Sequence, residues 1–270
     1  MLSALPVRQW REAKPICVIR MNMLRYDFSP RVVAFTTTRE GGVSLGAYAS
    51  MNANPFCGDR PEHVAENRRR LCAALGIASD RLVFPHQTHT SNVCRVDSTT
   101  LPDALDDVDA VFTTERNLCI GVSTADCLPL LLCHAEAGVV AAVHAGWRGT
   151  AGLIARATVE TMRDELGVDA AGLRVQMGPC IGLEAFEVGD EVCEQFRQAG
   201  FPMERVARRM GPRWHIDLQE ANAWALEVAG VRAESIVRNP HCTFTEHGRF
   251  FSARRLGIAS GRLLSGIMLR

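Results

Sequence analysis

The chain has 270 residues, and its 30 Lys and Arg residues balance 30 Asp and Glu residues, which gives a formal net charge of zero. A balanced charge argues against a surface that attracts nucleic acid or an anionic membrane, so we expect neither as a partner. Hydrophobic residues make up 47% of the chain, and no apolar run approaches the roughly 20 residues of a membrane-spanning helix. The length fits one large domain.

The ten cysteines do not indicate a disulfide framework. The N-terminal segment interleaves charged and apolar residues and lacks the apolar core of a secretory signal, which favours the cytoplasm, where most cysteines stay reduced and buried. Pro6 and Pro15 interrupt this segment, and no helix or strand period runs through it. We therefore predict a flexible extension over residues 1–22 and a catalytic domain over residues 23–270.

The predicted elements follow in chain order. A β-rich stretch over residues 31–40 runs into a turn at Gly41 and Gly42. A helix begins at Pro61, carries acidic residues early and arginines late, and ends at Gly76. Short apolar runs alternate with turns over residues 82–146 before a second helix that ends near residue 167. Further helices near residues 188–199 and 217–229 and a strand near the C-terminus complete the pattern.

Two stretches, LLLCHA and GVVAAVHAG, are almost continuously apolar. Strands covered on both faces have this pattern, whereas strands with one solvated face alternate apolar and polar residues. The sequence therefore predicts a layered α/β fold, and no linker or internal repeat divides the chain.

Three segments place a potential metal ligand beside a turn at the end of an apolar strand, namely HQTHTSNV, STADCLPLLL and VVAAVHAGWRG. Strand ends from distant parts of a chain can converge on one pocket. A His, Cys, His set suits Zn²⁺, and three protein ligands leave the fourth position for water or substrate, as catalytic zinc requires. No CxxC or HExxH spacing forces the ligands together, so ordinary packing stays an alternative for each residue.

A series of motifs over residues 25–270 resembles the YfiH-like or laccase-domain family: TTTREGGVS, CGDRPEHVAENRRRL, HQTH, STADCLPLLL, HAGWRGT, GPCIG and CTFTEHGRFFSARR. The resemblance implies a single-domain, layered α-β-β-α architecture with mixed sheets. It also implies that His89, Cys127 and His144 hold the metal. Only the family pattern favours His89 over His86, which can instead pack or line the pocket.

Five further residues are candidates for the site, four in these motifs and Asn52 in the MN pair that precedes CGDRPEHVAENRRRL. Asp126 and Cys180 are candidate catalytic groups, and their alternatives are a turn cap and a buried structural thiol. Arg148 can bind an anion such as phosphate through two hydrogen bonds, or form a structural ion pair. Asn52 and Arg254 are candidates for substrate binding, although Asn52 can instead organise its loop and Arg254 can pair with helix carboxylates.

The resemblance implies a zinc-dependent purine nucleoside phosphorylase that acts on adenosine, inosine and S-methyl-5′-thioadenosine and also deaminates adenosine. Its partners are then a small-molecule nucleoside and phosphate, and we expect a monomer or homodimer. The alternatives are a copper-dependent polyphenol oxidase, a hydrolase that edits peptidoglycan precursors, and a metal-stabilised binding module. The chain has eight histidines, too few and too dispersed for a multicopper cluster, although a His₂Cys site can bind adventitious copper.

Overall fold

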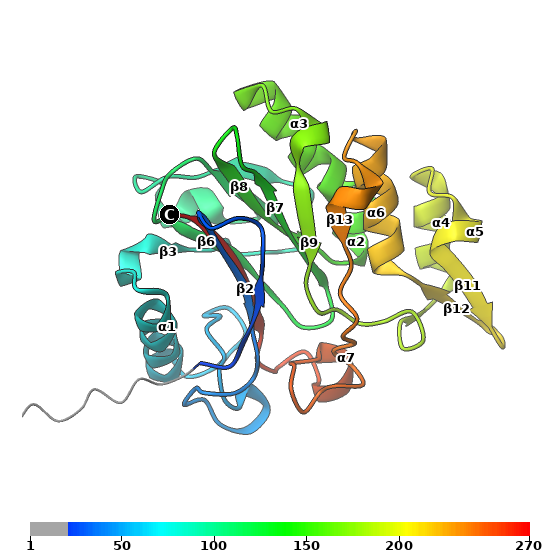
Figure 1. The fold of residues 1–270 in the computed structure, drawn as a ribbon. Coiled ribbons are helices and arrows are strands. Elements are labelled where there is room, and N and C mark those ends of the chain that lie inside the picture. Colours follow the sequence, from blue (N-terminus) through cyan, green and yellow to red (C-terminus); the bar gives the residue numbers. More distant parts are fainter. Residues whose placement is uncertain (1–20) are drawn as a thin grey trace, which may run out of the picture.

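The computed structural model describes residues 21–270. In it, two sheets lie face to face, with helices on their outer faces and a small third sheet at one side (Figure 1). The predicted extension over residues 1–22 lies outside the described residues except for Met21 and Asn22. Met21 packs against a buried apolar cluster, and the side chain of Asn22 donates to Glu40 Oε2 at 2.8 Å. Two residues that the prediction assigned to the extension therefore contact the rest of the domain.

The sheets contain both parallel and antiparallel strand pairs. The five-stranded sheet has the order β1 (Met23–Tyr26), β2 (Val32–Thr37), β14 (Leu263–Leu269), β6 (Cys119–Thr124) and β3 (Leu82–Val83). The six-stranded sheet has the order β13 (Ile236–Val237), β9 (Arg174–Met177), β7 (Leu128–His134), β8 (Val139–Ala145), β5 (Ala110–Thr113) and β4 (Val93–Arg95). The small sheet has the order β10 (Glu187–Val188), β12 (Arg213–Ile216) and β11 (Ala207–Met210).

The described helices are mostly short. They are α1 (Pro61–Leu75), α2 (Trp147–Ala151), α3 (Ile154–Leu166), α4 (Asp190–Gln198), α5 (Met203–Val206), α6 (Leu218–Val228) and α7 (Ala253–Leu256). The predicted helix from Pro61 is α1, and Gly76 ends it with a left-handed φ of 65°, a conformation that glycine adopts without strain. The second predicted helix is α3, which ends at Gly167 in the same way.

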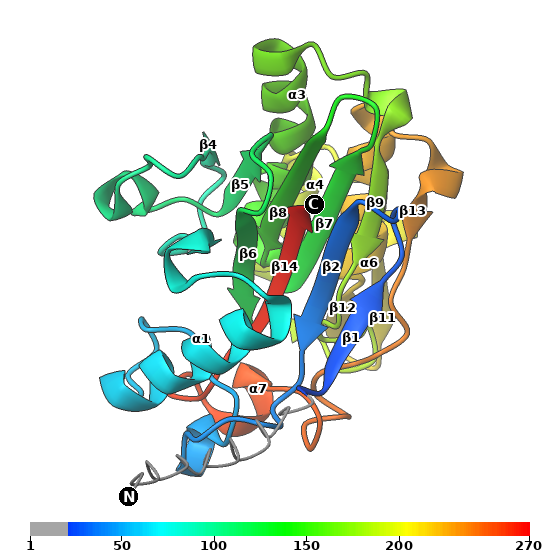
Figure 2. The ribbon, with the colours of Figure 1, turned by 60° about the vertical axis from the view of Figure 1, so that its left-hand side comes forward.

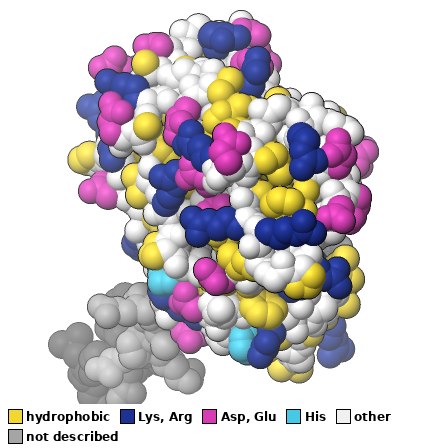
Figure 3. Space-filling view, turned by 90° about the vertical axis from the view of Figure 1, so that its right-hand side faces the viewer, with side chains coloured by type: hydrophobic (Ala, Val, Ile, Leu, Met, Phe, Trp, Pro, Cys, Tyr) yellow, Lys and Arg dark blue, Asp and Glu magenta, His cyan; other side chains and the backbone are white. Residues whose placement is uncertain are grey.

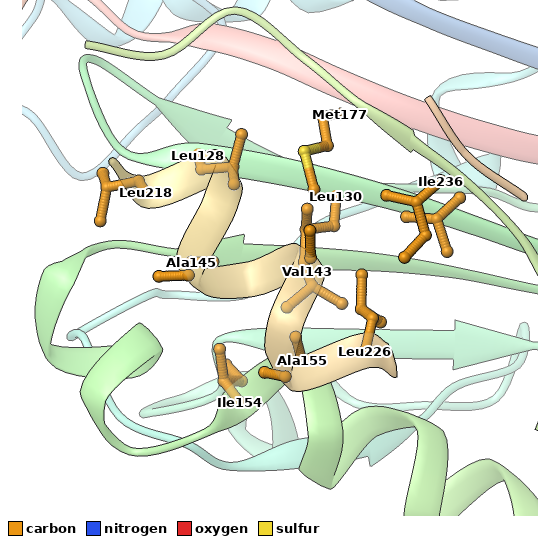
Figure 4. Close-up of a cluster of buried hydrophobic side chains, with 14 of the residues drawn as sticks. Leu128, Leu130, Val143, Ala145, Ile154, Ala155, Met177, Leu218, Leu226 and Ile236 are labelled. Carbon is orange, nitrogen blue, oxygen red and sulfur yellow. The ribbon is translucent and has the colours of Figure 1, made fainter. Parts of the chain in front are cut away.

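Side chains along β7 and β8 point alternately to the two faces of the six-stranded sheet, and each face packs against a different layer. Leu128 and Leu130 of β7 and Val143 of β8 face α3 and α6 in one buried cluster (Figure 4). Leu131 and Val140, which point the opposite way, pack against the five-stranded sheet. On the far face of that sheet, β14 packs against α1 through a third cluster. The layered α-β-β-α architecture is therefore confirmed, and so is the burial of β7 and β8 on both faces.

The face that carries α4, α5 and α6 mixes basic and acidic side chains (Figure 3). One group on this face is Arg205 with Glu220 and Glu227, in which Arg205 Nη2 lies 2.9 Å from Glu227 Oε1. Exposed pairs of this kind contribute little stability, typically about 0–1 kcal/mol each. No helix within residues 21–270 is long and apolar enough to cross a membrane.

Candidate metal centre

The structure brings the three sequence-predicted ligands together. His89 lies in the loop between β3 and β4, Cys127 immediately precedes β7, and His144 is on β8. Antiparallel pairing of β7 and β8 places Pro129 opposite His144, so the start of one strand lies beside the end of the other. The ligand atoms of His89, Cys127 and His144 lie within 4.8 Å of one another, and Cys127 Sγ is 3.8 Å from His89 Nε2.

This spacing fits a metal ion. A tetrahedral ion with bonds of about 2.3 Å to sulfur and 2.0 Å to nitrogen separates the two ligand atoms by roughly 3.5 Å. Within residues 21–270, it is the one group of three or more His, Cys, Asp or Glu side chains arranged to hold a metal ion. Three protein ligands leave a coordination position for water or substrate.

Asp109, which belongs to none of the sequence motifs, fixes two parts of this group. Its carboxylate is fully buried, and the Oδ1 atom lies 2.6 Å from His144 Nδ1. The same carboxylate accepts hydrogen bonds from the backbone N–H groups of Thr88, His89 and Thr90. Because ionised Asp109 can only accept, His144 Nδ1 donates and Nε2 is left for the metal. This is the carboxylate–histidine pair that orients metal ligands in proteins.

The backbone around the ligands adopts unusual conformations. His89 has φ 69° and Asp126 has φ 83°, both in the left-handed region that costs non-glycine residues energy. The three N–H bonds to Asp109 hold the His89 segment in this conformation. Gly146, just after β8, is also required, since a Cβ there would lie 2.9 Å from Cys127 Sγ and 2.9 Å from His89 Cδ2.

Protonation in the metal-free group follows from its contacts. Burial by itself raises the pKa of Cys127, but the neighbouring His144 and His89 lower it to about 6. Burial by itself lowers the pKa of His144, whereas the Cys127 thiolate and Asp109 raise it to about 9. For Asp109, the effect of burial is exceeded by the hydrogen bond and charge of His144, and its pKa falls to about 2. The group therefore holds a thiolate, an imidazolium and a carboxylate near pH 7.

A cavity of about 450 Å³ opens in front of the three ligands. This volume falls in the range of small-molecule sites. Its wall includes Trp147 from α2 and Phe186 before β10, and α7 borders it at the lower end of the sheets in Figures 1 and 2.

An aromatic pair forms another part of the wall. The rings of Phe56 and His86 stack with centroids 4.2 Å apart and an interplanar angle of 25°. The Phe56 segment is fixed because Phe56 N donates to Asn54 Oδ1 at 2.6 Å and Asn54 Nδ2 donates to Ser123 Oγ at 2.6 Å. His86, which the sequence left as the competitor of His89, therefore lines the cavity and takes no part in the ligand group.

Asp126 and Arg254 both reach the cavity and contact each other. Asp126 Oδ2 accepts from the backbone N of Arg254 at 2.6 Å, and Oδ1 accepts from Thr243 Oγ1 at 2.6 Å. Both carboxylate oxygens are thus engaged in joining the turn before β7 to the C-terminal segment. The Arg254 side chain is exposed and its guanidinium lies over the Phe186 ring, 5.6 Å from the centroid.

Asn52 does not line the cavity but supports the loop that does. Its fully buried side chain donates to Asp59 Oδ2 at 2.9 Å and accepts from the backbone N of Arg262 at 3.1 Å. The structure therefore places Asn52 behind Asn54 and Phe56, which form the wall. This arrangement matches the loop-organising alternative more closely than direct substrate contact.

Cys180 and Arg148 also lie off the cavity wall. Cys180 is 1% exposed, and burial raises the pKa of its thiol well above the usual range, which disfavours the nucleophilic thiolate. Its neighbour Ile181 lines the cavity instead. Arg148 is exposed, with its guanidinium 4.3 Å from the ring centroid of Trp147, and Trp147 rather than Arg148 contributes to the wall.

Fold and ligand group together define a laccase-domain protein of the YfiH-like class. The family model described as "Multi-copper polyphenol oxidoreductase laccase" matches residues 33–270, and the chain belongs to this family. A relative from Bacteroides thetaiotaomicron, named "Purine nucleoside phosphorylase", is 42% identical to this chain. The match covers 87% of this chain and 90% of the relative. "Adenosine deaminase RL5", from an unknown prokaryotic organism, is 43% identical, with 87% and 93% covered.

A solved structure shows the same fold. YlmD from Geobacillus stearothermophilus is 34% identical and superposes with a TM-score of 0.85 over 89% of this chain and 93% of its own. The resemblance inferred from the motifs is therefore confirmed at the level of family and fold.

Proposed function

We propose that this protein is a zinc-dependent purine nucleoside phosphorylase that cleaves adenosine, inosine and S-methyl-5′-thioadenosine and also deaminates adenosine. The observation that carries the proposal is the His89, Cys127 and His144 group at a cavity of about 450 Å³. The names of two relatives, a purine nucleoside phosphorylase and an adenosine deaminase, support the substrate class.

The cavity suits a nucleoside. Phe56 and His86 offer a stacked aromatic surface, and stacking on aromatic side chains tolerates any purine base. Trp147 and Phe186 add apolar area to the wall, while Asn54 supplies a polar group.

The ligand set indicates how a metal would contribute. Thiolate and imidazole ligands suit zinc, and because Asp109 accepts from His144 Nδ1, His144 would bind the ion through Nε2. A bound ion with an open position supplies Lewis acidity at the cavity. The protein itself orients the ligands, encloses the base and excludes part of the solvent.

The test is product analysis with zinc-loaded, copper-free protein. We expect adenosine with phosphate to give adenine and ribose 1-phosphate, and adenosine without phosphate to give inosine and ammonia. Adenine, hypoxanthine and inosine are separated by chromatography, so the two reactions are counted independently. Release of neither base nor inosine would refute the proposal.

A copper-dependent polyphenol oxidase is the second candidate, because the matching family model carries that description. The described residues offer one metal group with two histidines, whereas an oxygen-reducing copper cluster requires several histidine-rich sites. Zinc-loaded protein freed of copper should therefore leave phenols unoxidised, and rapid oxidation would favour this candidate.

A further inference from the structure

Phosphorolysis requires a binding site for phosphate close to the nucleoside. The residues that line the cavity limit which arginine can bind it. Two arginines line the cavity, Arg254 and Arg262. Arg148, the sequence candidate, lies outside it. The one carboxylate on the described wall is Asp126, and both of its oxygens already accept hydrogen bonds.

Arg262 is committed to its own loop. Nη1 donates to the carbonyl of Ser260 at 2.6 Å and to that of Gly261 at 3.1 Å, and Nη2 donates to the carbonyl of Ile258 at 2.9 Å. These bonds use the guanidinium to close the turn before β14. A phosphate there would have to break the loop contacts.

Arg254 keeps one side of its guanidinium available. Nη1 and Nη2 both donate to a single acceptor, the Glu187 carbonyl, at 3.2 Å. Among the described residues, no partner receives a hydrogen bond from Nε, and no carboxylate forms an ion pair with this side chain. The free edge, with Nε–H and a neighbouring Nη–H, is the fork that binds phosphate through two hydrogen bonds.

The position of Arg254 is fixed beside the metal ligands. Its backbone N–H donates to Asp126, the residue that precedes Cys127, at 2.6 Å. The stack over Phe186 and the Glu187 contact direct the side chain along the cavity wall. An anion held here has access to the same cavity as the nucleoside.

The geometry points to Arg254 as the binding site for the phosphate co-substrate, an inference that rests on the proposed function. An oxygen of HPO₄²⁻ forms a bond to C1′ of the ribose while the C1′–N9 bond breaks and its electron pair leaves with the base. The phosphate proton ends on the base, which gives the free purine and ribose 1-phosphate. Deamination uses water and needs no phosphate.

The two reactions therefore serve as internal controls for each other. Arg254→Gln should raise the KM for inorganic phosphate about 10- to 100-fold with saturating inosine, since a charge-assisted bidentate contact is lost. Deamination of adenosine in phosphate-free buffer should stay within about twofold. Arg254→Lys, which keeps the charge without the fork, should give an intermediate KM.

Arg255→Gln is the matched control, because Arg255 is exposed, stacks over Phe244 at 5.3 Å and lies off the cavity wall. It should leave both reactions unchanged. Equal losses of phosphorolysis and deamination in Arg254→Gln would overturn the inference and assign Arg254 a structural role. A raised phosphate KM in Arg148→Gln with a normal value in Arg254→Gln would also overturn it. Wild-type protein with no phosphate-dependent base release would instead refute the proposed function.

Discussion

Replacing Asp109 with Asn tests how the ligand group is held. Asp109 accepts through both oxygens, from His144 Nδ1 and His89 N at Oδ1 and from Thr88 N and Thr90 N at Oδ2. In either orientation, the NH₂ group of Asn faces donors that it cannot satisfy. A buried donor without an acceptor costs about 1–3 kcal/mol, and because the backbone donors here are part-buried, two such losses cost less than about 6 kcal/mol together. Zinc affinity should also fall about 10- to 100-fold, because His144 loses its orienting partner.

The assay pairs zinc competition with a chromophoric chelator and urea unfolding of the metal-free protein. Asp107→Asn is the control. Asp107 Oδ1 also accepts a hydrogen bond from the His89 loop, from Thr88 Oγ1 at 2.7 Å, but Asp107 is exposed and does not contact His144. We expect this control to retain wild-type zinc affinity. A folded Asp109→Asn protein with wild-type zinc affinity would refute the role assigned to this carboxylate.

Three further predictions follow from the same geometry. Gly146→Ala should lower zinc occupancy at least tenfold by metal analysis, because its Cβ would lie 2.9 Å from Cys127 Sγ, whereas Gly248→Ala has open space and should be neutral. With the pKa of Cys127 lowered to about 6 and that of His144 raised to about 9, metal entry near pH 7.5 displaces one proton from His144. Zinc affinity should then rise about tenfold per pH unit up to about pH 9. Calorimetry in buffers of different ionisation enthalpy measures the protons released on binding, and finding none would contradict this. Phe56→Ala should raise the KM for inosine about fivefold, from about 1 kcal/mol of lost stacking, with recovery in Phe56→Trp; equal KM values would argue against base stacking.

Local patterns predict the layered fold and its buried central strands, whereas the identity of the three ligands follows from the family motifs. The continuous apolar runs of β7 and β8 report burial on both faces, and Gly76 marks the end of α1, because both depend on nearby residues. The convergence of His89 with Cys127 came from the family motifs, since no short spacing links them.

The other features of the site depend on contacts between distant segments of the chain, which the sequence does not show. Asp109 adjoins an apolar run and therefore needs buried partners, but the sequence does not show that these are His144 and the His89 loop. Arg148 follows Trp147 in α2, and successive helical residues point about 100° apart, so only one of the two lines the cavity. The side chain of Asn52 is directed into the protein by its bond to Asp59, seven residues later in a loop without a regular period.

We propose that nucleoside chemistry depends on a metal that His89, Cys127 and His144 hold. The most direct measurement follows zinc content and phosphorolysis of inosine together while zinc is removed by a chelator and then restored, in wild-type protein and in Cys127→Ala. We predict that activity falls and returns in proportion to bound zinc in the wild type, and that the folded variant neither retains zinc nor cleaves inosine. Full phosphorolysis by zinc-free wild type, or by folded Cys127→Ala, would contradict the account.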